Sequence, residues 1–538
     1  MARIIPSVTE ALHPSNINSK ALVKLVTTVY YGTIVHTPAL NQLQVFPNCA
    51  VVVGSSGSII NLIPNCSSIS DVFTKYNPEL DQKSTKIVDI SGNPYQFFFP
   101  GFVDTHIHAP QFPNAGIFGN STLLDWLDTY TFPLEASFEN LHKANKIYSR
   151  VVHQTLQNGT TTASYFATIH PEATKLLSNI CFKNGQRALI GRVCMDDNSP
   201  DFYSESHEDM KTNTVDVCNH IKQLGATTDQ ECDAIILPTL TPRFAPSCTA
   251  KTLAWLGDFR EEKKLHVQSH VSENIDEIKL VSSLFPDASC YTGVYEDYNL
   301  LGAKTVLAHG VHLTPLEISI LHKNQSGISH CPISNSSLTS GETRVRQLLN
   351  SGIKVSLGTD MSGGFSPSIL SSARQAHLVS RHLAMKTKKE EDKLSVNDVL
   401  YLATKGGAQC LDMESTIGDF GKGKKWECQL VDLKSTGSQI DIFDWQLPDY
   451  LIQRGGYHLK IAGRELLNSD DYFQDFHGVG LSKFDNNEEH KWINDDGTFI
   501  DADQSKFEDL IAKWLFNGDD RNTTKVYVNG RCVIDKTE

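Results

Sequence analysis

The residues of this chain that could do chemistry begin with two histidines separated by a single residue, His106 and His108. They follow two short runs of apolar, β-favouring residues, 97–99 and 102–103, and residues two apart in a strand point to the same face. Two neutral imidazoles on one face can bind one metal ion, because imidazole is the usual nitrogen ligand of zinc. The spacing therefore predicts half of a metal site at the end of a strand, and the other ligands must come from elsewhere in the chain.

Three other apolar runs also stop on a histidine or a carboxylate, at His270, His309 and Asp360. Any one of these could be a hydrogen-bonded core residue, which is the commoner role of a single histidine after an apolar run. Their recurrence at the ends of predicted strands favours a shared site instead. Three nitrogen ligands, from His106, His108 and His270, and the carboxylate of Asp360 would leave a position for water, as in a catalytic metal site.

The chemistry of such a site is hydrolytic. Zinc lowers the pKa of a bound water to about 7, so hydroxide becomes available at neutral pH. Glu273 lies three residues beyond His270, in the loop after the strand, where its carboxylate could face the same cavity and move protons. His309 could orient the water or stabilise the charge that develops during the reaction.

Catalytic groups at the ends of several strands require a fold that brings those ends together, and residues 100–412 have the pattern of one. Short apolar runs alternate there with helical stretches such as 141–157, and residues 395–398 (Ser-Val-Asn-Asp) predict a capped helix start. The alternation predicts an α/β fold, a (β/α)8 TIM-like barrel with its active site at the carboxyl ends of the strands. The eight predicted strands are 102–103, 160–167, 188–195, 234–240, 265–270, 305–309, 327–330 and 354–360.

The two chain ends are predicted to form a small β-sandwich domain. Residues 1–99 contain short β-patterned runs broken by turns, and residues 413–538 return to that pattern at 416–433 and 524–534. Between those last runs, residues from about 435 to 505 are polar and are interpreted as an insertion on the surface. The predicted strands of the first part are 22–35, 43–53, 59–63 and 86–88.

Composition narrows the partners and the compartment. The formal net charge is −14, so the chain has no basic excess to offer a nucleic-acid backbone or an anionic membrane, and neither is expected as a partner. The 12 cysteines include no CxxC pair, which favours reduced thiols over a disulfide framework. No stretch of about 18 apolar residues could span a bilayer. We therefore expect a cytoplasmic protein.

Several longer segments resemble a known family. They are similar to the guanine deaminases of the amidohydrolase superfamily, a superfamily of metal-dependent hydrolases, over residues from about 22 to 434 and the last thirty. The HxH pair and the aspartate of strand eight occur throughout the superfamily, whereas the Tyr-Thr-Phe-Pro stretch, the SYFATIH strand and the Thr-Pro-Arg-Phe turn are more specific. The segments are PGFVDTHIHAPQ (100–111), LLDWLDTYTFPLE (123–135), NGTTTASYFATIH (158–170), GQRALIGRVCMD (185–196), TPRFAPSC (241–248), QSHVSEN (268–274), LAHGVHL (307–313), SHCPISNSSLTSG (329–341), LGTDMSGGFSPS (357–368) and GDDRNTTKVYVNG (518–530).

The resemblance implies an enzyme that converts guanine to xanthine and ammonia, with one zinc ion per subunit, in a homodimer. In that family the two strand-one histidines, the strand-five histidine and the strand-eight aspartate hold the metal. Carried over to this sequence, the implied metal ligands are His106, His108, His270 and Asp360. The implied catalytic residues are Glu273 as the proton shuttle, His309 beside the water, and Asp360. The implied substrate contacts are Gln111, Arg243 and Phe244 on the purine, together with His108, His270, Glu273 and Asp360.

Two other functions stay open at this point. Another amidohydrolase, such as an adenosine or cytosine deaminase or a hydrolase of cyclic amides, would share the metal ligands and differ at Gln111, Arg243 and Phe244. A guanidinium only donates hydrogen bonds, so Arg243 suits the oxygen at C6 of guanine and not the amino group of adenine. A barrel that has become a binding protein would be expected to lack a ligand, and none is missing. Deaminases built on H-x-E and P-C-x-x-C are excluded, because no PCxxC occurs.

Overall fold

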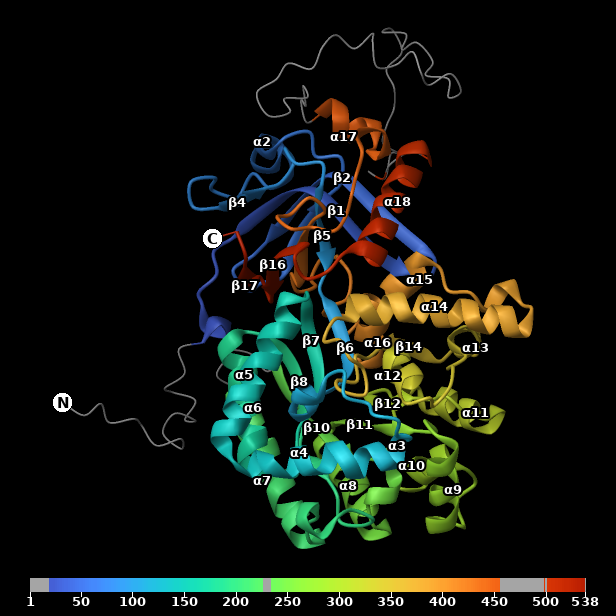
Figure 1. Cartoon of the computed structure of the whole chain (residues 1–538). Coiled ribbons are helices and arrows are strands. Elements are labelled where there is room, and N and C mark those ends of the chain that lie inside the picture. Colours follow the sequence, from blue (N-terminus) through green and yellow to red (C-terminus); the bar gives the residue numbers. More distant parts are fainter. Residues whose placement is uncertain (1–18, 226–233, 455–497, 499–500, 538) are drawn as a thin grey trace, which may run out of the picture.

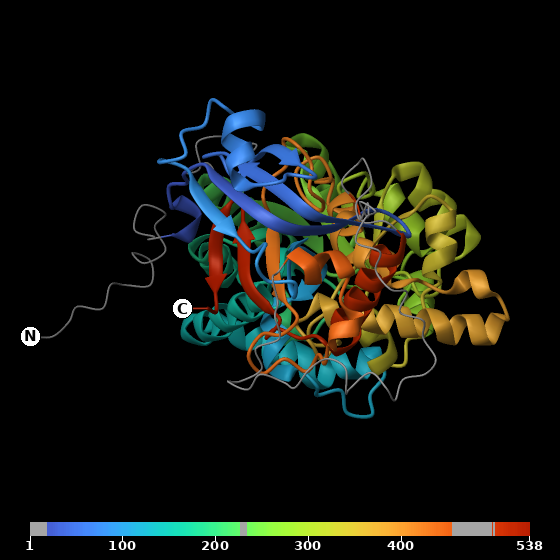
Figure 2. The ribbon, with the colours of Figure 1, turned by 90° about the horizontal axis from the view of Figure 1, so that it is seen from above.

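The chain forms a barrel and a smaller sheet domain that lies against one end of it (Figure 1). The structure, a computed structural model, describes residues 19–225, 234–454, 498 and 501–537. The chain starts in the sheet domain, runs through the whole barrel and then returns to the sheet domain. Strands from both chain ends therefore lie side by side there (Figures 1 and 2), which confirms the prediction that the two ends build one β domain.

The barrel contains parallel strands that neighbour one another in chain order. All eight predicted strands are present, and β6 and β12 end at the expected His108 and His309. The predicted strand 188–195 stops at Gly191, and the predicted strand 354–360 stops at Leu357, before Asp360. A short extra strand, β9 (Val193–Cys194), pairs with β10. The barrel strands are β6 (Phe102–His108), β7 (Thr160–Phe166), β8 (Arg187–Gly191), β10 (Ile236–Pro242), β11 (His266–Val271), β12 (Thr305–His309), β13 (Gly327–His330) and β14 (Lys354–Leu357).

The seam between β6 and β14 closes at the mouth of the barrel. The backbone N–H of Asp360 donates to the carbonyl oxygen of His106 at 2.8 Å, and the N–H of His108 donates to the oxygen of Met361 at 3.2 Å. Backbone hydrogen bonds of this kind hold neighbouring chain segments in register. The bonds that close the barrel thus also fix the distance between the first and the last of the predicted metal ligands.

Helices follow the strands and cover the outer face of the barrel (Figure 1). The helix predicted at 141–157 is confirmed with those bounds, and its first turn is capped by Asn140, whose side chain accepts from the N–H groups of His142 and Lys143. The capping box predicted at Ser395 is also present. The helices of the barrel are α3 (Leu123–Trp126), α4 (Phe132–Ala136), α5 (Leu141–Gln157), α6 (Pro171–Asn184), α7 (His207–Gly225), α8 (Ala250–Lys263), α9 (Ile275–Leu284), α10 (Tyr291–Asp297), α11 (Pro315–Asn324), α12 (Pro332–Ser337), α13 (Val345–Asn350), α14 (Ile369–Thr387), α15 (Val396–Tyr401) and α16 (Gly407–Cys410).

The sheet domain is one continuous hydrogen-bonded sheet, not two separate sheets as a sandwich would have. Its order is β17-β16-β15-β5-β1-β2-β3, and β4 pairs with β1 beside β5. The sheet curls so far that the segment before β15 contacts the start of β3. In this contact the N–H of Ile59 donates to the carbonyl oxygen of Lys424 at 2.7 Å. Tyr30, Phe98 and Trp426 pack together inside the curl. The strands are β1 (Thr28–Ala39), β2 (Gln42–Val53), β3 (Ile59–Ile63), β4 (Lys86–Asp89), β5 (Gln96–Pro100), β15 (Cys428–Asp432), β16 (Thr523–Val528) and β17 (Arg531–Asp535).

One tryptophan joins the sheet domain to the barrel. Phe98 of β5 faces the sheet core, so its neighbours Phe97 and Phe99 face the other side, as the alternation of a strand requires. There they meet Trp514 of α18 (Asp501–Asn517), with ring centroids 5.7 Å and 5.1 Å apart. Phe102, on the first barrel strand, stacks on the same indole at 5.9 Å. A helix from the end of the chain therefore wedges against the strand that leads into the active site.

The start of the first predicted strand is wrong. Residues Lys20–Leu22 form a short 3₁₀ helix, and β1 begins only at Thr28. Ser19 caps this turn, since its Oγ accepts from the N–H of Ala21 at 3.0 Å and donates to the carbonyl oxygen of Phe182 at 2.5 Å. A serine that bonds nearby backbone groups competes with strand pairing, and here it prevails over the apolar pattern.

The expected insertion at 435–505 is described only at its two flanks. Residues 455–497 and 499–500, which make up most of it, lie outside the described residues. The first flank is less polar in its environment than its composition suggests, because Ile440, Ile442, Leu447 and Leu451 are buried in the main hydrophobic core. This flank contains a 3₁₀ turn (Asp444–Gln446) and α17 (Asp449–Arg454).

Two properties of the described residues bear on the environment of the protein. None of their helices combines the length and the apolar character needed to cross a lipid bilayer. The cysteines among them are free thiols, and most are buried.

Candidate active site

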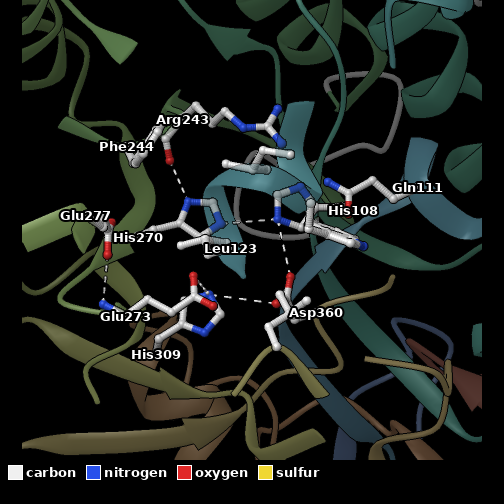
Figure 3. A pocket seen from close by; sticks show the side chains of 13 residues that line it. His108, Gln111, Leu123, Arg243, Phe244, His270, Glu273, Glu277, His309 and Asp360 are labelled. Carbon is white, nitrogen blue, oxygen red and sulfur yellow. Dashed lines mark hydrogen bonds and ion pairs between the residues drawn. The ribbon is translucent and has the colours of Figure 1, made fainter. Parts of the chain in front are cut away.

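The predicted site residues meet in a pocket at the carboxyl ends of the barrel strands (Figure 3). Arg243 and Gln111 lie on one side of the pocket in this view, and Glu273, His309 and Asp360 lie on the other. His106 is buried beside Asp360 and does not line the pocket itself. The lining residues are His108, Gln111, Leu123, Trp126, Leu127, Arg243, Phe244, His270, Glu273, Glu277, His309, Leu338 and Asp360.

The four predicted metal ligands lie close together. Nε2 of His106 is 3.2 Å from Oδ1 of Asp360, and Nε2 of His108 is 3.4 Å from the same oxygen. Nε2 of His108 is also 3.2 Å from Nε2 of His270. The ligand atoms form two groups that share His106, one with His108 and Asp360 and the other with His270 and His309, and within each group all ligand atoms lie within 4.8 Å of one another.

These donors fit a divalent metal ion. Nε2 of His106 is buried without a hydrogen-bond partner. Nδ1 of His270 lies 2.5 Å from the carbonyl oxygen of Arg243, so the ring donates from Nδ1 and leaves a lone pair on Nε2. Burial lowers the pKa of His106, and it lowers the pKa values of His108 and His270 much further. Neutral imidazoles with free lone pairs beside a carboxylate are the ligand set that zinc prefers.

The carboxylate of Asp360 is charged and held by a strained backbone. Burial alone would raise the pKa of Asp360, but the neighbouring His106, His309 and His108 keep it well below its ordinary value. Asp360 has a φ of 44° and His309 a φ of 75°, both in the left-handed region that residues other than glycine rarely adopt. Strain of this kind collects at functional sites, where the surrounding hydrogen bonds fix it.

Glu273 and His309 form a pair at the side of the ligand cluster. Nε2 of His309 lies 3.3 Å from Oε2 of Glu273 and 3.8 Å from Oδ2 of Asp360. Burial raises the pKa of Glu273 to about 7, against the opposing charge of His309. A carboxyl group whose pKa is near neutrality can both accept and release a proton at working pH.

Two neighbours fix the position of Glu273. Oγ of Ser340 donates to its Oε1 at 3.1 Å. Oε2 of Glu277 accepts from the backbone N–H of Glu273 at 2.9 Å, and Tyr291 donates to the other oxygen of Glu277 at 2.6 Å. Glu277 thus holds the loop between β11 and α9 that carries Glu273.

The loop after β13 fixes the ring of His309. Oγ1 of Thr343 donates to the carbonyl oxygen of His309 at 3.0 Å, so it accepts from Nδ2 of Asn335 at 3.2 Å. Oδ1 of Asn335 must then face Nδ1 of His309, 2.9 Å away, and accept a hydrogen bond from it. Asn335 therefore keeps a proton on Nδ1 of His309, and the neighbouring carboxylates of Glu273 and Asp360 raise the pKa of the ring against the effect of burial.

The other side of the pocket is built around a buried carboxylate. Glu135 of α4 is 0% exposed, and its two oxygens accept from the guanidinium of Arg243 at 2.6 Å and 3.1 Å. Gln111 donates to the same carboxylate at 2.8 Å, and so does the hydroxyl of Tyr203, also at 2.8 Å. The carboxylate outweighs the effect of burial on Arg243 and raises the pKa of its guanidinium. Both predicted purine-reading side chains are therefore anchored on one residue.

Four residues that hold other site residues in place were not predicted from the sequence: Glu135, Glu277, Asn335 and Ser340. Signals for two of them were present. Asn274 and Glu277 have the spacing of a capping box, which the structure confirms at the start of α9. Glu135 ends the apolar stretch Thr-Phe-Pro-Leu, where an unpaired carboxylate would be costly. For Asn335 and Ser340 the partner is distant in the sequence, and no local pattern identifies it.

Comparison with known proteins agrees with this geometry. The profile of the amidohydrolase family matches residues 97–533. A probable guanine deaminase of Schizosaccharomyces pombe is 39% identical over 507 residues, which cover 94% of this chain and 83% of that protein. The guanine deaminase of Homo sapiens is 36% identical over 508 residues, with 94% of this chain and 96% of that protein covered.

A solved structure is similar over nearly the whole chain. It is the guanine deaminase of C. acetobutylicum with guanine bound in its active site, which has a TM-score of 0.73 and 28% sequence identity and covers 94% of this chain and 99% of its own. Similarity of this extent in sequence and in fold is a family relationship. The chain therefore belongs to the amidohydrolase family and groups there with the guanine deaminases.

Proposed function

We propose that this chain is a zinc-dependent guanine deaminase that hydrolyses guanine to xanthine and ammonia. One observation carries the proposal: the side chains that can bind a metal and move protons share a pocket with a pair of anchored hydrogen-bond donors, Arg243 and Gln111. A pocket with donors on one side and a hydrolytic centre on the other suits a ring that carries an oxygen at one position and an amino group at another. Guanine has both, at C6 and at C2.

His106, His108, His270 and Asp360 would hold the metal. When bound, zinc lowers the pKa of water and so supplies hydroxide at neutral pH. The protein's own groups do the rest. Glu273 takes a proton from the water that attacks C2 and returns it to the purine side, so that a C–O bond forms, the C–N bond breaks and nitrogen leaves as ammonia. His309, fixed by Asn335, lies where it can stabilise the developing charge.

The base is positioned by the opposite side of the pocket. The guanidinium of Arg243 has N–H groups beyond the two that Glu135 accepts, and these can pair with the C6 oxygen of guanine. Adenine presents an amino donor at that position, so its complex would leave two donors facing each other. A buried polar group without a partner costs about 1–3 kcal/mol. Phe244, which is nearly buried beside Arg243, offers an apolar surface for the ring.

A matched assay of the purified wild type and the Asp360→Ala variant tests the proposal. The wild type is expected to contain zinc and to release ammonia from guanine at least roughly 10⁴-fold faster than from adenine, because sites that hydrogen-bond a substrate group reject the analogue that lacks it by such factors. The variant loses one of four ligands and is expected to lose metal and turnover together. A wild type that releases ammonia faster from adenine would overturn the substrate, and full metal content in Asp360→Ala would overturn the ligand set.

The proposal extends to the metal, the assembly and the compartment. Zinc is favoured over magnesium or calcium because three of the four ligands are imidazoles, whereas those ions prefer oxygen. Free thiols among the described cysteines favour the reducing cytoplasm. A homodimer is proposed from the family resemblance. Elemental analysis, light scattering of the purified protein and fluorescent tagging in cells check the three in turn.

A further inference from the structure

Glu135 is placed to decide which hydrogen bonds the substrate pocket can make, although it does not line the pocket. It lies in α4, outside the barrel strands, and is 0% exposed. Its oxygens accept four hydrogen bonds, two from Arg243, one from Gln111 and one from Tyr203. An ionised carboxylate has about four sites for accepting hydrogen bonds, so none is left for a substrate. Its influence on the substrate must act through the residues that it holds.

The carboxylate fixes the orientation of the Gln111 amide. An ionised carboxylate only accepts hydrogen bonds, so the group of Gln111 that faces Glu135, 2.8 Å away, must be the NH₂ end. On its other side the amide oxygen of Gln111 accepts from the backbone N–H of Ser362 at 3.3 Å. Turning the amide over would set oxygen against oxygen at Glu135 and N–H against N–H at Ser362. Gln111 therefore has an N–H donor left for the pocket, and its oxygen is directed at the backbone.

The guanidinium of Arg243 is fixed in the same way. Two of its N–H groups point at the two oxygens of Glu135, and the ring of Phe132, also in α4, lies 5.1 Å from its central carbon. The two-point contact prevents the planar group from rotating. What remains for the pocket is again only donors, since arginine has no acceptor.

We propose that Glu135 is a positioning residue that makes this edge of the pocket an array of donors and thereby selects purines with an oxygen at C6 over purines with an amino group there. The inference rests on the proposed function for its substrate class. It adds that the selection depends on a buried carboxylate that no substrate touches. Without this carboxylate only the 3.3 Å bond from Ser362 holds the Gln111 amide, which can then turn more readily and offer its oxygen to an amino group.

The test is Glu135→Gln in the zinc-loaded enzyme, with direct binding of two ligands that lack the reactive amino group at C2. These are hypoxanthine, which has an oxygen at C6, and adenine, which has an amino group there. A glutamine at 135 can donate as well as accept, so only the bond from Ser362 still favours the original orientation of Gln111. We expect the Kd of hypoxanthine to rise about tenfold while the Kd of adenine does not rise, and the KM of guanine to increase more than kcat falls, because the loss is one of base recognition.

The matched control is Glu427→Gln. Glu427 forms the same kind of buried pair with Arg187, whose Nε donates to it at 2.8 Å, but this pair lies at the start of β8, at the opposite end of the barrel. Its loss should lower stability and leave the ratio of the two Kd values unchanged. Glu135→Asp is the second variant, because it keeps the charge beside Arg243 and withdraws the oxygens by one methylene. Glu135→Asp should change the ratio of the two Kd values in the same direction, and it replaces Glu135→Gln as the test if that variant does not fold.

Equal changes in both Kd values, or no change in either, in a folded and zinc-loaded Glu135 variant would overturn the inference. A different result would refute the proposed function. A wild type that prefers hypoxanthine to adenine but releases no ammonia from guanine would refute the reaction and leave the positioning role of Glu135 measurable by binding alone.

Discussion

In the proposed reaction Glu273 must meet two opposite demands with one carboxyl group, because it accepts a proton from water and then gives it up to the departing nitrogen. Its burial and its contact with His309 suit it to both. Glu273→Gln keeps the size of the side chain and its bond to Ser340 but cannot carry the proton. We expect kcat for guanine to fall by about 10²- to 10⁴-fold. Steady-state ammonia release, measured together with zinc content, checks this.

The zinc content decides how the result is interpreted. Glu273 is not one of the four proposed ligands, so the variant should contain as much zinc as the wild type. If Glu273→Gln were purified without metal, Glu273 would be a ligand and the proton-transfer role would fall to another group.

The residues proposed to hold the metal could be located from the sequence, because their types are rare and they stand where apolar runs stop. His106, His108 and His270 were found in this way. Residues that act only on other residues could not. Asn335 is one asparagine among many, and what distinguishes it is a contact with His309, 26 positions earlier, that only the folded chain provides.

At the scale of elements, the segment between β13 and α13, which contains α12, determines the orientation of the His309 ring. Asn335 accepts from Nδ1 of His309 and is itself hydrogen-bonded to Thr343, so this segment keeps a proton on Nδ1 and fixes the orientation of the ring. Asn335→Ala removes this acceptor, so that neither the proton on Nδ1 nor the orientation of the ring is fixed any longer. We expect kcat to fall by about 10- to 100-fold with zinc retained, since the loss of a buried hydrogen bond costs about 1–3 kcal/mol.

Ser336→Ala is the control for this prediction. Ser336 lies in the same helix, α12, and its hydroxyl donates to the oxygen of Pro332 at 2.8 Å without contact to the site. It should leave kcat within about threefold of the wild type, as substitutions away from special features usually do. Equal losses in the two variants would mean that α12 acts only through stability and that Asn335 has no separate role.

Barrel strands were predicted well because each is a short apolar run between helices, and all eight appear at the expected places. The sheet domain was predicted less well. Its strands were recognised, but whether they form one sheet or two depends on pairing between residues far apart, such as Phe98 of β5 and Leu430 of β15. Periodicity reports which residues share a face and carries no information on which strand lies next to which.

For the molecule as a whole, the order of the chain ties the active site to the sheet domain. The strand that carries His106 and His108 continues directly from β5, and Trp514 packs on residues of both. This contact was not predicted, because Trp514 belongs to a helix that follows the polar insertion and its partners lie more than 400 residues earlier. Only the return of the chain to its starting domain brings them together.

Stability of the whole molecule should depend on pH through a histidine at the bottom of the barrel. His266 begins β11, and its Nε2 donates to the carbonyl oxygen of Leu411 at 3.0 Å. Burial lowers its pKa from 6.5 to about 4, and the nearby Lys304 adds to the shift. Between pH 6.5 and pH 4 the unfolded chain therefore binds a proton at His266 that the folded chain does not bind. The contribution of this residue to stability is full above pH 6.5 and is lost as the pH falls towards 4.

His266→Gln isolates this contribution, because glutamine can reach the oxygen of Leu411 with its amide N–H and does not titrate. Urea unfolding of both proteins at several pH values gives the difference between their stabilities. The wild type should lose about 3 kcal/mol more than the variant between pH 6.5 and pH 4, which is the shift in pKa expressed as free energy. Other groups that titrate in this range, including the ligand histidines, are common to both proteins and cancel in the difference. Parallel stability curves would show that the ring is protonated in the folded barrel and that burial does not keep it neutral.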